Sequence, residues 1–110
     1  MDLVIVESPF AGRDIEERNE NISYAREAVR DSLLRGEAPI ASHLLYTQAG
    51  ILNDDVPEER SLGIEAGLAW RAVATKSVVY VDRGISKGME YGIKLATEAG
   101  IPIEFRSLME

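Results

Sequence analysis

The fold of this chain is decided by Ser77-Val-Val-Tyr-Val-Asp82 and the following Arg83-Gly-Ile-Ser-Lys-Gly-Met-Glu90-Tyr-Gly92. A short apolar run ends on an acid, a glycine-bearing turn follows, and a helix then opens with a carboxylate about one turn in. In a parallel α/β sheet, ligands bind in the crevice beyond the carboxyl ends of the strands. The N-terminus of a helix at that place offers unpaired N–H groups and the positive end of the helix dipole. The stretch therefore predicts a buried strand, a turn that faces a ligand, and a helix.

The rest of the chain repeats this alternation of short apolar runs and amphipathic segments. Strands are predicted at residues 3–6, 38–42, 78–81 and 101–105, and helices from Asn21 to about Arg35, after Asp55 and after Ser86. Strands that alternate with helices imply a parallel sheet with right-handed crossovers. We therefore expect one domain over residues 1–110, a three-layer, flavodoxin-like α/β fold with about four strands in the order 2-1-3-4.

Three segments carry more specific expectations. Residues 13–20 are highly charged and are predicted to form a mobile loop before a helix capped by Asn21. Residues 43–56 form a long and rather apolar connection, which is typical of a lid or an oligomer contact. In the helix that Asp55 is expected to cap, the helical spacing predicts a buried stripe, made of Leu62, Ala66, Ala69 and Val73.

The composition excludes several classes of function. The chain has no cysteine and one histidine, so a disulfide or a thiolate metal site is impossible. A net charge of −7 disfavours nucleic-acid polymers as partners, and no apolar run approaches the ~18–20 residues that span a bilayer. No P-loop or G-x-G-x-x-G fingerprint is present, so no cofactor is expected. We expect a cytoplasmic protein without a membrane partner, whose pocket could still hold a small nucleoside or nucleotide.

The run Gly88-Met89-Glu90-Tyr91-Gly92 resembles the G-M-E-x-G or G-Y-E-x-G signature of nucleoside 2-deoxyribosyltransferases and related nucleotide N-hydrolases. This superfamily includes small phage and bacterial members that often have no assigned activity. The resemblance implies that Glu90 is the nucleophile that attacks the anomeric carbon of the sugar. It also implies a homo-oligomer, since members complete their sites with a neighbouring subunit.

The candidate site residues follow from this motif and from the ends of the predicted strands. The resemblance places the turn Glu7-Ser8-Pro9-Phe10 along the sugar and base pocket, and Phe10 could stack on a base. By position, Asp82 or His43 is the candidate to protonate the departing base. The predicted catalytic residues are Glu90, Asp82 and His43, and the predicted binding residues are Glu7, Ser8, Pro9, Phe10, Gly84, Ser86, Gly88 and Met89. We expect Glu7, Ser8, Phe10, His43, Asp82, Gly84, Ser86 and Glu90 to surround one cleft.

Two functions remain open on the sequence. The first is cleavage or transfer of a nucleoside or nucleotide N-glycosidic bond through Glu90, and the intact motif favours it. The second is a non-catalytic small-nucleotide-binding protein of the same fold. Two departures from the family favour the second: Ile5 or Val6 stands where a tyrosine often orients the nucleophile, and Asp82 lies two residues before the usual position of an acid, which is Gly84 here.

Overall fold

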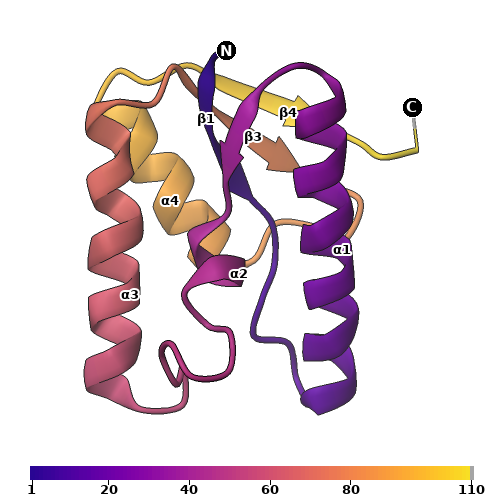
Figure 1. Cartoon of the computed structure of the whole chain (residues 1–110), viewed down its shortest axis with the longest axis vertical. Helices are drawn as coiled ribbons and strands as arrows, with labels where there is room; N and C mark the ends of the chain where they lie inside the picture. Colours follow the sequence, from indigo (N-terminus) through magenta and orange to yellow (C-terminus); the bar gives the residue numbers. More distant parts are fainter. Residues whose placement is uncertain (110) are drawn as a thin grey trace.

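The computed structural model of the chain describes residues 1–109 and contains a four-stranded parallel sheet covered by helices on both faces (Figure 1). The strand order is β2-β1-β3-β4, which confirms the predicted order 2-1-3-4 and the α/β class. The elements are β1 (Leu3–Glu7), α1 (Ile15–Leu34), β2 (Ala38–Ile40), α2 (Ser42–Leu45), α3 (Pro57–Ala69), a 3-10 turn (Trp70–Ala72), β3 (Lys76–Tyr80), α4 (Lys87–Glu98) and β4 (Ile103–Arg106).

The two faces of the sheet differ in what covers them. Successive residues of a strand point to opposite faces, so Val4 and Val6 of β1 face α1, whereas Ile5 and Glu7 face the side of α3 and α4 (Figure 1). The α1 side holds the packed core, which consists of Val4, Val6, Tyr24, Ala28, Ala41, Val78 and Tyr80. The other face therefore carries the polar carboxylate of Glu7 where a second apolar layer would otherwise be expected.

Helix α1 begins earlier than predicted. Its N-cap is Asp14, whose Oδ1 accepts a hydrogen bond from the Glu17 backbone N–H at 2.8 Å, so the expectation of a mobile loop over 13–20 is wrong. The acidic side chains after the cap lie near the positive end of the helix dipole, which stabilises this charged first turn. Asn21, the predicted cap, is instead buried inside the helix.

Helix α3 stands away from the sheet. None of its residues is buried, and Leu62 and Val73 of the predicted buried stripe are 55% and 58% exposed, so that expectation is wrong. Asp55 is not the cap either, because the N-cap is Val56 and Pro57 opens the helix. Helix α3 packs mainly on α2 and on the 3-10 turn that follows it, which leaves open space between α3 and the sheet.

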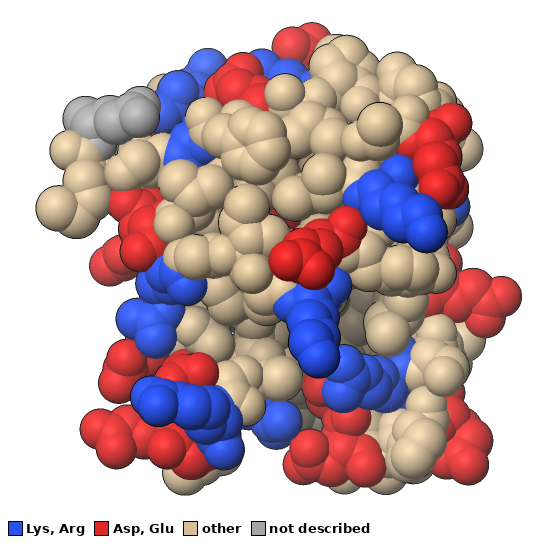
Figure 2. Space-filling view, turned by 180° about the vertical axis from the view of Figure 1, so that it is seen from behind, with Lys and Arg blue, Asp and Glu red and all other residues tan. Residues whose placement is uncertain are grey.

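The surface seen from behind carries both signs of charge (Figure 2). Acidic and basic side chains are interspersed over this face, and neither sign gathers into one broad patch. A protein that binds nucleic-acid polymers usually presents a basic stripe, and this face has none.

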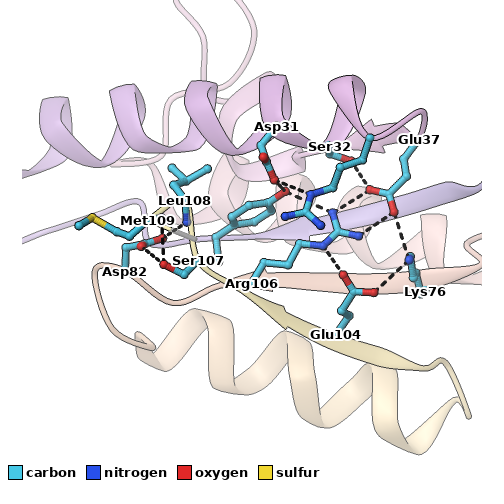
Figure 3. A network of polar contacts seen from close by, with 12 residues as sticks. Asp31, Ser32, Glu37, Lys76, Asp82, Glu104, Arg106, Ser107, Leu108 and Met109 are labelled. Carbon is cyan, nitrogen blue, oxygen red and sulfur yellow. Dashed lines mark hydrogen bonds and ion pairs between the residues drawn. The ribbon is translucent and has the colours of Figure 1, made fainter.

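A buried ion network joins the far edge of the sheet to α1 (Figure 3). The Arg106 guanidinium, 4% exposed, donates to both carboxylate oxygens of Glu37 at 2.8 and 2.7 Å and also pairs with Glu104. Lys76 lies 3.1 Å from Glu37 and from Glu104. The hydrogen bonds from Arg106 hold the pKa of the Glu37 carboxyl at about 2, so Glu37 stays ionised although it is buried. This network fixes β4 against the start of β2.

Candidate functional site

A cleft of about 800 Å³ lies at the carboxyl ends of β1 and β3 and extends along the sheet under α3. Its volume falls in the range of small-molecule sites, about 300–1,000 Å³. Ten of the eleven predicted site residues line it: Glu7, Ser8, Pro9, Phe10, His43, Asp82, Gly84, Ser86, Gly88 and Met89. The topology explains this convergence, because the carboxyl ends of parallel strands meet at one edge of the sheet.

Glu90 is the predicted site residue that does not line this cleft. It lies in the first turn of α4 and is exposed, whereas Gly88 and Gly92 line the cleft. Residues four apart lie on one face of a helix, and a residue two positions from each lies on the opposite face. The structure therefore directs Glu90 away from the cleft that the other candidates share.

Glu7 is a carboxylate that the structure brings into the cleft. A Cβ atom added to Gly92 would lie 2.0 Å from Glu7 Oε2, so the carboxyl group lies directly against the α4 backbone at the second glycine of the motif. Within residues 1–109, its side chain has no hydrogen bond and no ion pair. Burial without a compensating cation raises the pKa of Glu7 to about 7. Glu7 can thus exchange a proton near neutral pH.

Ser8, the residue after Glu7, forms a partly buried pair with His43. Ser8 Oγ and His43 Nε2 lie 2.7 Å apart, and Ser8 is only 5% exposed. Burial of the imidazole lowers the pKa of His43 to about 4, so its ring is neutral at pH 7. A neutral imidazole can position Ser8 or accept a proton, but it does not supply a proton to a leaving group at neutral pH.

Asp82 is held by the end of the chain (Figure 3). Its carboxylate accepts hydrogen bonds from the Ser107 hydroxyl at 2.5 Å, the Tyr24 hydroxyl at 2.6 Å and the Leu108 backbone N–H at 3.0 Å. These donors, with Ser107 the strongest, lower the pKa of Asp82 to about 2. Asp82 is therefore an ionised anchor of the β3–α4 turn and is poorly suited to protonate a departing base.

Asn21, which was predicted only as a helix cap, links two turns that line the cleft. Asn21 donates to the Phe10 carbonyl at 3.2 Å and accepts from Arg83 Nε at 2.8 Å, so it ties the turn after β1 to the turn after β3. The Arg18 guanidinium lies 5.3 Å from the centroid of the Phe10 ring. Arg18 thus makes a cation–π contact with the Phe10 ring.

The inner side of α3 also lines the cleft, which the sequence analysis missed. The residues concerned are Arg60, Ile64, Gly67 and Leu68 of α3 and Arg71 of the 3-10 turn that follows it. Their spacing of three or four residues is a helical face, so a signal was present, but the more apolar stripe through Leu62 obscured it. Arg71 donates to the Leu95 carbonyl of α4 at 3.2 Å and joins the two helices at one end of the cleft.

Residues 1–109 contain neither a cluster of metal ligands nor a helix that could span a membrane. No group of three or more histidine or acidic side chains in this part of the chain is arranged to hold a metal ion. None of the helices described is both long and apolar enough to cross a membrane.

Comparison with known proteins gives a family and a fold. The model of a family described as Domain of unknown function (DUF7768) matches residues 2–106. No curated protein matches the sequence. Among solved structures, a 2-deoxyribosyltransferase from the psychrotolerant bacterium Bacillus psychrosaccharolyticus is similar, with a TM-score of 0.65 and 18% identity. The similarity covers 96% of this chain and 72% of that one, and at this identity it establishes a shared fold alone.

Proposed function

This chain belongs to the DUF7768 family, and we propose that it binds a nucleoside or nucleotide in the cleft and cleaves or transfers at the N-glycosidic bond. The observation that carries the proposal is the place of the cleft. It lies at the carboxyl ends of β1 and β3, and Glu7 faces into it. The fold is similar to that of a 2-deoxyribosyltransferase, which supports this class of ligand. Phe10 offers an aromatic surface on which a base can stack.

The role of Glu90 is the open part of this proposal. The resemblance of the motif makes Glu90 the nucleophile that forms a glycosyl-enzyme ester, which water or a second base then resolves. Nucleophilic attack requires reacting atoms within about 3–3.5 Å. The exposed position of Glu90, away from the cleft lining, does not provide that arrangement for a ligand in the cleft. Substitution of Glu90 tests the resemblance directly.

The experiment is a base-release assay with purified protein. We expect the wild type to release free base from at least one member of a panel of ribo- and deoxyribonucleosides and their 5′-monophosphates, detected by liquid chromatography. A second run with an added acceptor base separates transfer from hydrolysis. If Glu90→Gln abolishes release, Glu90 is the nucleophile, whereas release at the wild-type rate removes it from the mechanism. Absence of release from every compound would refute the enzymatic proposal.

A non-catalytic nucleotide-binding protein is the second candidate. The exposed position of Glu90 and the apolar residues Ile5 and Val6 in place of an orienting tyrosine favour it. Such a protein would release no base but would bind a nucleoside or nucleotide, with an increase in the melting temperature by mass action. A thermal-shift measurement on the same panel therefore distinguishes the two functions.

We also propose that the chain forms a homo-oligomer through α3 and the turn after it. Three large apolar side chains outside the cleft are exposed there: Leu62 at 55%, Trp70 at 41% and Val73 at 58%. Large apolar side chains that are exposed together on one element favour an interaction site. Light scattering should report a mass above 12.1 kDa, and a monomer at high micromolar concentration would contradict the proposal.

A further inference from the structure

Among the acidic residues that line the cleft within residues 1–109, Glu7 alone combines three properties. It lies at the end of β1, its carboxyl group lies against the backbone of α4 at Gly92, and its side chain is unpaired within residues 1–109. Asp82, by contrast, accepts three hydrogen bonds from Tyr24, Ser107 and Leu108. Only glycine at position 92 leaves room for the Glu7 carboxyl group, since a Cβ would overlap it.

We infer that Glu7 is the general acid of this site, which protonates the base as it leaves. The inference rests on the proposed function and assigns a catalytic residue within it. The charged and titratable groups that line the cleft with Glu7 come from every element around it: Glu17 of α1, His43 of α2, Asp54 before α3, Arg60 of α3, Arg71 of the 3-10 turn, Asp82 and Arg83 of the β3–α4 turn, and Lys87 and Tyr91 of α4. His43 is neutral at pH 7 and Asp82 is ionised, so neither is in the acidic form that protonates a leaving group.

Glu7 alone can supply the proton that the departing base takes up and can regain it at the end of the reaction. The bond between the anomeric carbon and the base nitrogen breaks, and its electron pair stays with the base. The carboxylic acid of Glu7 gives its proton to the base and becomes a carboxylate. Water, or the N–H of an incoming base, adds to the anomeric carbon and returns one proton to Glu7. The products are the free base and either the free sugar or the new nucleoside, and Glu7 ends as it began.

Burial supports this role, because it raises the pKa of Glu7 to about 7. A general acid works best when its pKa lies near the working pH, since a substantial fraction is then protonated and the acid is still a good donor. The same environment that disfavours the carboxylate thus keeps a proton in the cleft.

The test uses two leaving groups in Glu7→Gln. A nucleoside base needs a proton to leave, whereas the 4-nitrophenolate of a 4-nitrophenyl riboside or deoxyriboside leaves without one. General acid catalysis typically contributes 10²–10⁴-fold. We expect Glu7→Gln to lose about 100-fold or more in kcat/KM with the best nucleoside and to stay within a few-fold of the wild type with the nitrophenyl glycoside. Glu98→Gln, an exposed glutamate of α4, is the matched control and should behave as the wild type with both.

The pH profile provides an independent readout. The wild-type kcat/KM for the nucleoside should fall above a pKa near 7, and this limb should be absent in Glu7→Gln. Equal losses with both leaving groups would overturn the acid role and indicate that Glu7 only binds or supports the site. Unchanged nucleoside turnover in Glu7→Gln would overturn it as well, while the proposed function would stand. No turnover by the wild type with either compound would refute the proposed function itself, and the inference with it.

Discussion

Removing the charge of Glu7 should stabilise the protein, although Glu7 lies in the functional cleft. In the folded chain the pKa of Glu7 is raised from 4.5 to about 7 by burial. The unfolded chain therefore loses this proton near pH 4.5, whereas the folded chain holds it until about pH 7. Stability from the protonated group is fully present below pH 4.5 and is lost as the pH rises through 7. At about 1.4 kcal/mol per pH unit, this interval corresponds to ~3 kcal/mol of lost stability at pH 8.

Glu7→Gln keeps the shape of the side chain and cannot ionise, so it avoids that loss. Urea unfolding of the wild type and Glu7→Gln at pH 4.5, 6 and 8 measures the difference between them, and other titrating groups cancel in that difference. We expect near-equal free energies of unfolding at pH 4.5 and an advantage of up to ~3 kcal/mol for Glu7→Gln at pH 8. A difference that is the same at all three pH values would show that the Glu7 carboxyl is solvated in the folded protein, and the reasoning would fail.

Three further substitutions test the site and the sheet. Gly92→Ala places a Cβ 2.0 Å from Glu7 Oε2, so the flexible carboxyl should be displaced; thermal melts should show a folded protein, and its unfolding free energy should lose the Glu7 pH dependence. The wild type should be destabilised relative to His43→Gln as pH falls from 6.5 to about 4, by up to ~3 kcal/mol, because the folded His43 resists protonation; parallel urea curves would contradict this. Arg106→Met leaves the buried Glu37 carboxylate with only Lys76 and the Ser32 hydroxyl as partners and should cost about 3 kcal/mol in urea unfolding, whereas Arg106→Met with Glu37→Met should recover part of it.

The sheet could be predicted from the sequence because each buried parallel strand is marked by a short apolar run of its own. The apolar run through Val78 and Val79, bounded by Asp82 and a glycine turn, is a pattern that a buried parallel strand produces by itself. The alternation with helices then leaves few topologies, and the observed order β2-β1-β3-β4 is one of them. Clustering of residues at the strand ends follows from that topology, which is why Ser8 and His43 were predicted together and meet at 2.7 Å.

The orientation of side chains within an element was harder to predict. The motif marks Glu90 by its residue type, but its direction depends on which face of α4 lies on the sheet, and Met89, Gly92 and Ala96 are the buried residues. Likewise, the stripe through Leu62 is apolar but does not meet a partner within residues 1–109. Protonation depends on burial and neighbours, so the sequence could not rank Glu7 above Asp82 as an acid.

The side chains of β1 alternate between the two faces of the sheet. Mutations that stabilise the core and mutations that change ligand preference therefore fall on different residues of this strand. Val4 and Val6 belong to the packed core on the α1 side, whereas Ile5 and Glu7 line the cleft on the other side. Stabilising mutations often cost activity when both depend on the same residues. Here a library of core variants on the α1 side and a library of cleft variants can be selected separately, one for thermostability and one for ligand preference. Their best members can then be combined in one strand, because the backbone of the sheet stands between the two sets of side chains.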